Sequence, residues 1–468
     1  MERLVIVSNR VPTLRSQDPA GGLSVALKSA LEESGGLWFG WSGKVTEAPE
    51  SDWRVTQHDG FSLATLDLCR AELRGYYEEF SNRTLWPVFH GRLDICRPER
   101  QAFDTYRSVN RRFAEVLVPL LKDGDTIWVQ DYHLIPLGKH LRHRGVEGPL
   151  GFFLHIPFPP PQTFAALPCY RELLADLCFY DLVGFQTEAC AENFRLAVAE
   201  FLDAEQGADG SLRMGDHVTQ VGAFPVSLDT AAFAEMAQSE EVEETADQLR
   251  DFMGDRQWIC GVERLDYTKG LAERLRAFST ALDRAPALRG QVSLIQVAAP
   301  SRESVPEYRE MRSKLEALSG SINGRFGSFD WTPIHYLNRT FSQKQLAALY
   351  RVSRVGLVTP LRDGMNLVAK EYIAAQDPED PGVLILSRFA GSAQELTEAL
   401  LVNPFDISST AEAIQDALEM PLAERRRRWR QMKLHLDTHD VHAWRNAFLQ
   451  ALAEASTESS AVGETRAA

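Results

Sequence analysis

Short runs of Val, Ile, Leu and Phe alternate along the chain with longer stretches in which apolar residues recur at helical spacing. This alternation is typical of parallel sheets covered by helices on both faces, and it predicts an α/β fold. In the first half we expect strands at 3–8, 37–40, 126–130, 151–155 and 182–186, and helices at 23–33, 100–121, 135–144 and 188–202.

The alternation starts again after a polar stretch at 204–217, which indicates a second α/β unit. Its strands are expected at 219–223, 257–262, 293–298, 335–337, 354–359 and 383–387, and its helices at 230–252, 271–284, 303–318, 342–350 and 365–376. We therefore expect an N-terminal domain at 1–225, a C-terminal domain at 226–440, a helix at 441–455 that packs back on the first domain, and a disordered tail at 456–468.

Composition narrows the class of protein. The 468 residues carry 50 Lys and Arg against 65 Asp and Glu, and a net charge of −15 argues against a nucleic-acid binder with a general basic face. No apolar run approaches the roughly 20 residues that a bilayer requires, so we expect a cytoplasmic protein without a membrane partner. The six cysteines form no CxxC pattern, and neither a metal nor another cofactor is predicted.

Polar residues that follow strands are the candidates for chemistry, because ligands of open parallel sheets bind at the carboxyl ends of the strands. The first strand ends at Arg10, and Gly21-Gly22 opens the next helix, where a diphosphate can bind free backbone N–H groups. An ordinary helix start with a surface arginine accounts for the same pattern equally well.

A second cluster runs from Gly261 to Gly270 and places Arg264 and Lys269 between a buried strand and a helix. Two cations at such a junction can clamp a diphosphate and stabilise the charge that grows as it leaves. The alternative is a surface pair of Arg264 with Asp266 before a capped helix. We favour phosphate binding.

Three further groups of residues have both a functional and a structural interpretation. Asp363 and the backbone amides of 364–367 stand at a helix start, where Asp363 either contacts sugar hydroxyls or caps the helix, and Glu371 either binds a ribose diol or is solvated. Asp131, His133 and His155 follow strands and either line one cleft or are structural. The aromatic residues are either core or platforms for sugar rings, and they are Trp38, Trp41, Tyr76, Tyr77 and Trp86.

A series of motifs in one order gives a more specific indication. The chain carries VSNR, GGL, LWFGWSG, YYEEFSNRTLWPVFH, VQDYHL, GFFLHIPFP, VERLDYTKG, APSR, GRFGS, WTPIHYLN, LVTPLRDGMNLVAKEY and LSRFAGSAQEL. With these motifs it resembles the trehalose-6-phosphate synthases, retaining glycosyltransferases of family 20, over residues 3–452. The resemblance implies a GT-B architecture, in which two Rossmann-like α/β domains flank a deep cleft.

The resemblance also implies a reaction and its residues. Glucose would pass from a nucleotide-diphosphate glucose to glucose 6-phosphate with retention of configuration, and the leaving diphosphate would take the acceptor proton. The implied catalytic positions are Arg264, Lys269, Asp131, His155 and Asp363. The implied donor positions are Gly22, His155, Arg264, Lys269, Asp363, Leu367, Val368 and Glu371. The implied acceptor positions are Arg10, Trp41, Tyr77, Trp86, Asp131 and Arg302.

Some features stay open at this stage. Family members commonly carry Gly at the position of Ser227, and a residue that disfavours positive φ there would alter the geometry of the domain junction. UDP is the first choice for the donor base, with GDP or ADP as alternatives, and a homodimer or homotetramer is expected from base rates. A synthase with another phosphorylated acceptor and a catalytically silent sugar-phosphate sensor are the competing functions.

Overall fold

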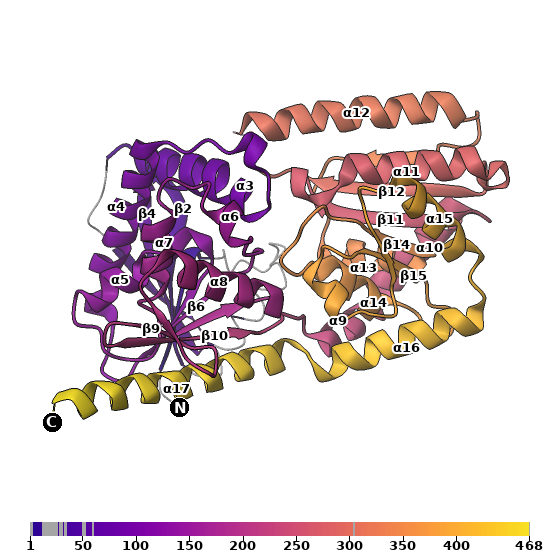
Figure 1. Cartoon of the computed structure of the whole chain (residues 1–468). Coiled ribbons are helices and arrows are strands. Elements are labelled where there is room, and N and C mark those ends of the chain that lie inside the picture. Colours follow the sequence, from indigo (N-terminus) through magenta and orange to yellow (C-terminus); the bar gives the residue numbers. More distant parts are fainter. Residues whose placement is uncertain are drawn as a thin grey trace. The chain divides into compact units, whose positions relative to one another are not determined.

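The computed structural model describes residues 3–11, 27, 31, 35–48, 53–58, 60–302 and 305–467. The chain divides into two compact units, which we call unit 1 (Met1–Pro225 with Trp444–Ala468) and unit 2 (Val226–Ala443) (Figure 1). Gly22 and, apart from Leu27 and Leu31, the predicted helix at 23–33 lie outside the described residues. No helix among the described residues is long and apolar enough to cross a membrane.

Unit 1 is built on a ten-stranded sheet with the order β3-β4-β2-β1-β5-β6-β7-β10-β9-β8 over the described residues. The strands from β4 to β10 run parallel, and the outer pairs β3–β4, β10–β9 and β9–β8 are antiparallel. The strands are β1 (Leu4–Arg10), β2 (Leu37–Thr46), β3 (Trp53–His58), β4 (Phe61–Cys69), β5 (Thr126–Gln130), β6 (Leu150–Phe153), β7 (Leu182–Phe185), β8 (Glu205–Gln206), β9 (Leu212–Met214) and β10 (His217–Ala223).

Helices and helical turns fill the connections of unit 1. They are α2 (Arg70–Glu72), the π-helix η1 (Leu73–Leu85), α3 (Trp86–Phe89), η2 (Leu93–Ile95), α4 (Arg100–Leu117), η3 (Val118–Leu120), η4 (Tyr132–Leu134), α5 (Leu137–Arg142), α6 (Pro161–Phe164), α7 (Tyr170–Leu177) and α8 (Glu188–Phe201). The edge pair β3–β4 was not predicted. Every residue of β3 is exposed, so that strand lacks a buried apolar face.

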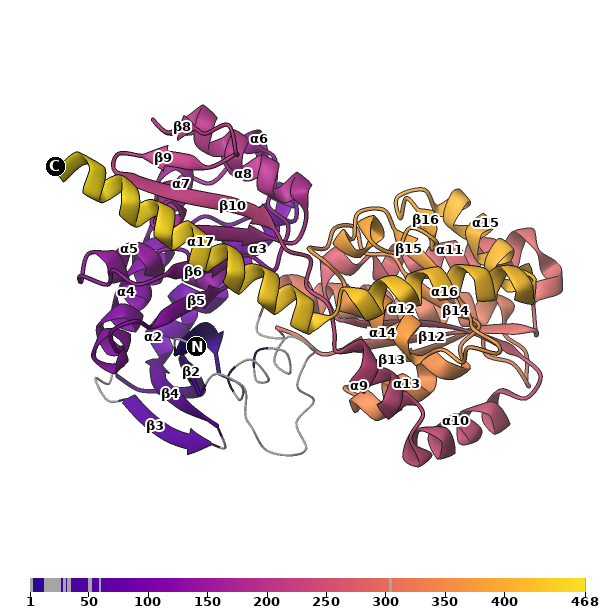
Figure 2. The same ribbon diagram turned by 90° about the horizontal axis from the view of Figure 1, so that it is seen from below.

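The last helix, α17 (Val441–Ala467), packs on the unit 1 sheet from Trp444 onward. Phe448 stacks on Trp128 of β5 at a ring distance of 4.6 Å, and Figure 2 shows α17 crossing the strands. Gly151 and Gly184 make room for it, since a Cβ at either position would lie within 2.9 Å of the Phe448 ring. The helix α17 extends to Ala467, through most of the segment 456–468 that follows the predicted helix at 441–455.

Unit 2 contains a six-stranded, wholly parallel sheet with the order β13-β12-β11-β14-β15-β16 over the described residues. Numbered along the chain, this order is 3-2-1-4-5-6, which is the order of a Rossmann sheet. The order of the strands reverses between β11 and β14, which is the switch point of the sheet. The strands are β11 (Gln257–Arg264), β12 (Val292–Ala299), β13 (Ile334–Leu337), β14 (Val355–Val358), β15 (Val383–Ser387) and β16 (Leu400–Val402).

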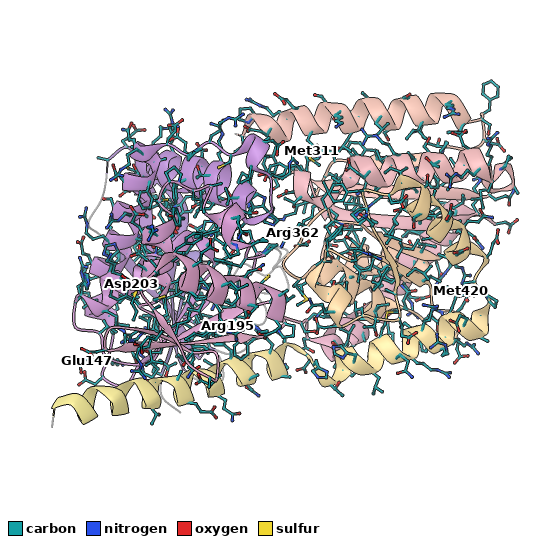
Figure 3. The ribbon with its side chains drawn as sticks, in the orientation of Figure 1. Glu147, Arg195, Asp203, Met311, Arg362 and Met420 are labelled. Atoms are coloured by element: carbon teal, nitrogen blue, oxygen red, sulfur yellow. The ribbon has the colours of Figure 1, made fainter. Side chains whose placement is uncertain are left out.

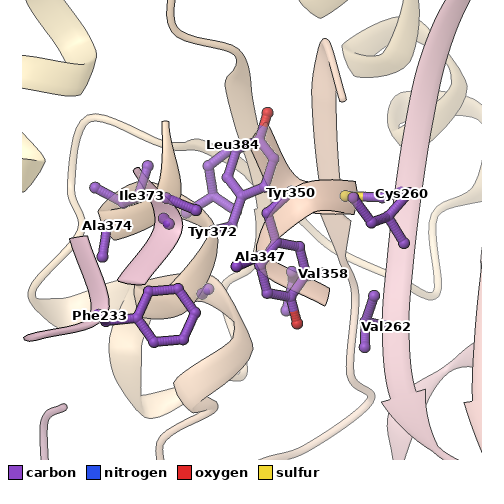
Figure 4. Close-up of a cluster of buried hydrophobic side chains, with 14 of the residues drawn as sticks. Phe233, Cys260, Val262, Ala347, Tyr350, Val358, Tyr372, Ile373, Ala374 and Leu384 are labelled. Carbon is purple, nitrogen blue, oxygen red and sulfur yellow. The ribbon is translucent and has the colours of Figure 1, made fainter. Parts of the chain in front are cut away.

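Two apolar cores cover the two faces of the unit 2 sheet. One lies under α9, α10, α13, α14 and α16 and includes Phe233, Tyr350 and Tyr372 (Figure 4); the other lies under α11, α12 and α15. The helices and turns are α9 (Thr230–Ala237), α10 (Glu240–Met253), η5 (Tyr267–Lys269), α11 (Leu271–Arg284), η6 (Pro286–Leu288), α12 (Pro306–Phe326), α13 (Gln343–Val352), α14 (Leu367–Ala375), η7 (Gly391–Gln394), α15 (Ile407–Glu419) and α16 (Leu422–Thr438).

Two expectations near the start of unit 2 need correction. The single helix predicted at 230–252 is two helices, because the extended backbone of Ser239 (ψ 152°) starts α10 anew. Ser227 is fully buried, and among the described non-glycine residues only Asp131, Arg302 and Asn366 have positive φ. The backbone at Ser227 therefore adopts no conformation that calls for glycine.

Candidate active site

The sheet of unit 2 brings two of the predicted clusters together at its switch point. β11 leads into η5, which carries Lys269, and β14 leads into the loop that carries Asp363. The Lys269 ammonium donates a hydrogen bond to the Asp363 carboxylate. Burial alone lowers the pKa of Lys269, but the carboxylates of Asp363 and Glu263 outweigh it and raise that pKa above its ordinary value. Lys269 is therefore a fixed cation at the carboxyl end of the sheet.

Gly270 shapes the turn that presents Lys269. Its φ is +64°, and a Cβ there would lie 2.2 Å from the carbonyl oxygen of Thr359. The neighbouring loop is tied to the same turn, because the N–H of Leu361 donates to the Thr268 carbonyl at 2.7 Å. Only glycine combines a left-handed backbone with this close approach.

Asn366 opens α14 and connects the groups around it. Its φ of +79° is left-handed, its side-chain oxygen accepts the N–H of Ala369 at 3.2 Å, and its amide nitrogen donates to Asp363 at 3.0 Å. Leu367 and Val368 are the first two residues of the helix, whose N–H groups have no partner within a helix. These amides and the helix dipole favour an anion at this end of α14.

Arg302 and Arg264 belong to a neighbouring cluster around Asp266, which is fully buried. The Arg302 guanidinium donates to the Tyr308 hydroxyl at 2.6 Å and to Asp266 at 3.4 Å. Burial favours the neutral acid, but the charges of Arg302 and Arg264 hold the pKa of Asp266 below its ordinary value. Arg264 is exposed at the end of β11, so its charge is accessible to a ligand.

Glu371 lies one turn into α14 and is paired with a tyrosine hydroxyl. The Tyr350 hydroxyl donates to it at 3.2 Å, and burial raises its pKa to about 7. Protonation of this side chain is therefore balanced near neutral pH. A carboxylate in this position can accept hydrogen bonds from two vicinal hydroxyls.

In unit 1 three of the predicted aromatic residues, Trp41, Tyr77 and Trp86, form a row with Tyr132 and His133. Trp41 lies 6.3 Å from Tyr77, Tyr77 stacks on His133 at 5.7 Å, and His133 contacts Tyr132 at 3.9 Å between ring centres. Tyr132 in turn lies 5.7 Å from Trp86, which is only 5% exposed. The row joins β2, η1, η4 and α3, and its members pack on each other, whereas Trp38 and Tyr76 are buried in the core.

Arg10 lies at the Trp41 end of this row. Its guanidinium carbon is 5.7 Å from the centre of the Trp41 ring, and its side chain is exposed. Gly43, with φ +89°, passes so close that a Cβ there would lie 2.8 Å from the guanidinium. The site therefore offers a charged group beside an aromatic face, which suits a phosphorylated sugar.

Asp131 and His155 come together at the ends of β5 and β6. The backbone N–H of His155 donates to the Asp131 carboxylate at 3.2 Å, and Asp131 has the strained φ of +75°. Burial lowers the pKa of His155 to about 3, so the ring is neutral. Its Nε2 lies 2.8 Å from the Gln130 amide oxygen, while the Gln186 amide nitrogen lies 3.4 Å from Nδ1, which places the proton on Nε2.

Several residues of these clusters were not singled out from the sequence. Glu263, Arg274 and Asn366 lie within or beside the quoted motifs, yet nothing in their local pattern shows that they meet. Gln130 and Gln186 end two strands and hold His155. A polar residue at the end of a buried strand is the only signal that marks them.

The class of protein follows from these features. Two α/β units of Rossmann type, one of them with a cluster of charged side chains at the switch point of its sheet, are the architecture of the GT-B glycosyltransferases that this chain resembles in structure. Residues 3–454 match the model of Glycosyltransferase family 20, and the chain belongs to that family. The trehalose-6-phosphate synthase of Sinorhizobium fredii (strain NBRC 101917 / NGR234) is 47% identical over 460 residues, 97% of this chain and 99% of that protein.

Solved structures show the same similarity. An α,α-trehalose-phosphate synthase (UDP-forming) from Burkholderia vietnamiensis superposes with a TM-score of 0.96 at 46% identity, covering 98% of each chain. A second such synthase, from Burkholderia xenovorans in complex with glucose-6-phosphate, gives a TM-score of 0.92 at 46% identity over 96% of this chain and 99% of that one. The α/β class and the GT-B architecture predicted from the sequence are thereby confirmed.

Proposed function

We propose that this glycosyltransferase transfers glucose from UDP-glucose to glucose 6-phosphate and forms α,α-trehalose 6-phosphate with retention of configuration. The observation that carries the proposal is the Lys269–Asp363 pair at the switch point of the unit 2 sheet, next to the open N–H groups of α14. The names of the similar synthases, two of them UDP-forming and one bound to glucose-6-phosphate, support the same donor and acceptor.

Unit 2 supplies the donor residues in this proposal. Arg264 and Lys269 bind the diphosphate, the amides of Leu367 and Val368 contact it, and Glu371 accepts the ribose hydroxyls. Gly22 is proposed for the same diphosphate. The exposed guanidinium of Arg264 and the raised pKa of Lys269 favour positive charge where the leaving group becomes more negative.

Unit 1 supplies most of the acceptor residues. The phosphate of glucose 6-phosphate pairs with Arg10, and with Arg302 from unit 2, while the aromatic row of Trp41, Tyr77 and Trp86 flanks the sugar. The exposed Arg10 beside Trp41 supports this assignment. Arg302 brings a guanidinium that Asp266 and Tyr308 already orient.

The chemistry balances without a carboxylate nucleophile. The bond between the anomeric carbon and the diphosphate oxygen breaks, the anomeric hydroxyl oxygen of the acceptor forms the new bond on the same face, and its proton passes to the departing UDP. Asp363 accepts hydrogen bonds from Lys269 and Asn366, and Asp131 accepts one from the backbone N–H of His155. In this proposal both carboxylates hold neighbouring groups in place. Retention through a charge-stabilised, oxocarbenium-like state needs such positioning more than a covalent intermediate.

The direct test is nucleotide release from UDP-, GDP- and ADP-glucose, each with and without glucose 6-phosphate, with the sugar product identified by mass and anomeric NMR. We expect release only with acceptor, fastest from UDP-glucose, and an α,α-linked disaccharide phosphate. Release with glycerol 3-phosphate in place of glucose 6-phosphate would favour the alternative acceptor. A folded protein that binds glucose 6-phosphate but releases no nucleotide from any of the three donors would favour the catalytically silent sensor.

We also propose a homodimer or homotetramer, on the base rate for soluble enzymes of this size. Light scattering coupled to size-exclusion chromatography tests this directly, and a mass of one chain would contradict it.

A further inference from the structure

A buried arginine of unit 2 lies next to the proposed donor residues Lys269 and Asp363 but is not itself proposed to contact the donor. Arg274 of α11 is completely inaccessible to solvent. Its guanidinium donates to the Thr359 hydroxyl at 3.1 Å, to the Gln296 amide oxygen at 3.1 Å and to the Glu263 carboxylate at 3.4 Å. A fully buried cation is tolerated only where its charge and its N–H groups have partners.

The strands leave a space shaped for this guanidinium. Gly261 of β11 faces it, and a Cβ there would lie 2.6 Å from the Nη1 of Arg274 and 2.8 Å from the Gln296 amide oxygen. The Gln296 amide nitrogen is fixed in turn by the carbonyl oxygens of Gly261, at 3.1 Å, and Val297, at 2.9 Å. A glycine and an oriented amide therefore keep the arginine at this point of the sheet.

Glu263 links Arg274 to the donor cluster. It is 5% exposed and accepts hydrogen bonds from Arg274 on one side and from the Asn366 amide nitrogen, at 3.3 Å, on the other. Burial raises the pKa of the Glu263 carboxyl, and the charges of Lys269 and Arg274 oppose that rise. Without Arg274, the carboxylate would have Lys269 as its main counter-charge.

The link matters because Asn366 has to be held in one orientation. Its oxygen caps α14 through Ala369, so its nitrogen must face acceptors, and those acceptors are Glu263 and Asp363. This arrangement caps the third N–H of the helix and leaves those of Leu367 and Val368 directed to a ligand.

We infer that Arg274 is a positioning residue of the donor site that acts through Glu263 and Asn366 and balances the negative charge beneath the diphosphate. The inference rests on the proposed function. When Glu263 and Asp363 are both ionised, their two negative charges match the two positive charges of Lys269 and Arg274, and the network is neutral. Loss of Arg274 would leave it with a net negative charge facing the anionic donor.

The test measures UDP binding by calorimetry and turnover with UDP-glucose for Arg274→Met, Glu263→Gln and the double variant. Arg274→Met should weaken UDP binding by about tenfold or more, because a buried negative charge is then uncompensated. Glu263→Gln in the same chain restores neutrality and keeps an oxygen for Asn366. The double variant should therefore bind UDP within about threefold of Glu263→Gln alone. If Arg274 served packing alone, its replacement would weaken UDP binding as much in the Glu263→Gln protein as in the unaltered one.

Arg425→Met is the matched control, since Arg425 is another buried arginine of unit 2, 7% exposed and paired with Asp380 at 2.7 Å, outside the donor cluster. It should bind UDP like the unaltered protein. The inference would be overturned if Arg274→Met bound UDP as tightly as the unaltered protein, or if the double variant bound UDP much more weakly than Glu263→Gln. The comparison of the double variant with Glu263→Gln decides the question even if Arg274→Met does not fold. An unaltered protein that neither binds UDP nor uses UDP-glucose would instead contradict the proposed function.

Discussion

Replacing Lys269 with Met is the most direct perturbation of the proposed chemistry. Methionine keeps much of the side-chain volume and removes the charge of a residue that is 9% exposed. Two unit charges about 4 Å apart at an effective dielectric constant of about 20 interact by about 4 kcal/mol. Each 1.4 kcal/mol, roughly, is a factor of ten in rate, so turnover should fall about 100- to 1000-fold. The carboxylates of Asp363 and Glu263 stay behind and increase the loss.

The assay is the initial rate of UDP release with both substrates saturating, together with thermal unfolding of each variant. Lys139→Met serves as the control, because Lys139 pairs with the buried Asp176 at 3.1 Å in unit 1, away from the proposed substrate residues. It should lose stability and retain turnover. A folded Lys269→Met variant with turnover within tenfold of the unaltered protein would refute the idea that Lys269 stabilises the leaving diphosphate.

Three further predictions follow from single residues. Arg302→Ala should raise the KM for glucose 6-phosphate about tenfold to a hundredfold and change UDP affinity little, because a charged hydrogen bond to phosphate is lost; steady-state kinetics with calorimetry checks this, and an unchanged KM would remove Arg302 from the acceptor site. Gly270→Ala should cost about 2 kcal/mol or more, measured by denaturant unfolding, since a Cβ at φ +64° would lie 2.2 Å from the Thr359 oxygen. The pKa of Glu371 is about 7, so UDP binding should weaken as pH falls below that value, and Glu371→Gln should abolish this pH dependence in calorimetry at pH 6 and 8.

The same pKa has a consequence for stability. The folded value of about 7 lies above the ordinary value of 4.5, so the unfolded chain holds fewer protons than the folded one between these limits. The contribution of Glu371 to stability is therefore full at low pH and is lost as pH rises through that window. Glu371→Gln should unfold at a higher temperature than the unaltered protein at pH 8 when no nucleotide is bound.

The parts of the fold that the sequence predicts well are the buried parallel strands. The predicted strands at 126–130 and 383–387 coincide with β5 and β15, because a strand covered on both faces is an apolar run with sharp polar ends. The edge strand β3 has no such run, and only Gln238 and Ser239 separate α9 from α10. Their boundaries depend on local backbone angles that the pattern of residues does not encode.

The candidate site divides in the same way. Motif residues such as Lys269 and Asp363 can be found from the sequence because charged groups follow apolar strands. The network beneath them cannot, because Glu263 and Asn366 are 103 positions apart and meet only through the parallel sheet. In the sequence Arg274 looks like any charged residue on the surface of a helix. Only its complete burial in the structure points to the positioning role that we infer.

Backbone strain marks the site more selectively than residue type does. Among the described residues, the non-glycine residues with positive φ are Asp131, Arg302 and Asn366. Two of them are proposed acceptor residues, and the third caps α14, whose first amides we propose contact the donor. Such conformations cost on the order of 1–3 kcal/mol each and persist only where their surroundings hold them. Hydrogen bonds hold each of them: Asp131 is bonded to His155, Arg302 to Asp266 and Tyr308, and Asn366 to Ala369 and Asp363. These costly backbone conformations therefore lie at residues that we propose contact substrate or hold a group that does.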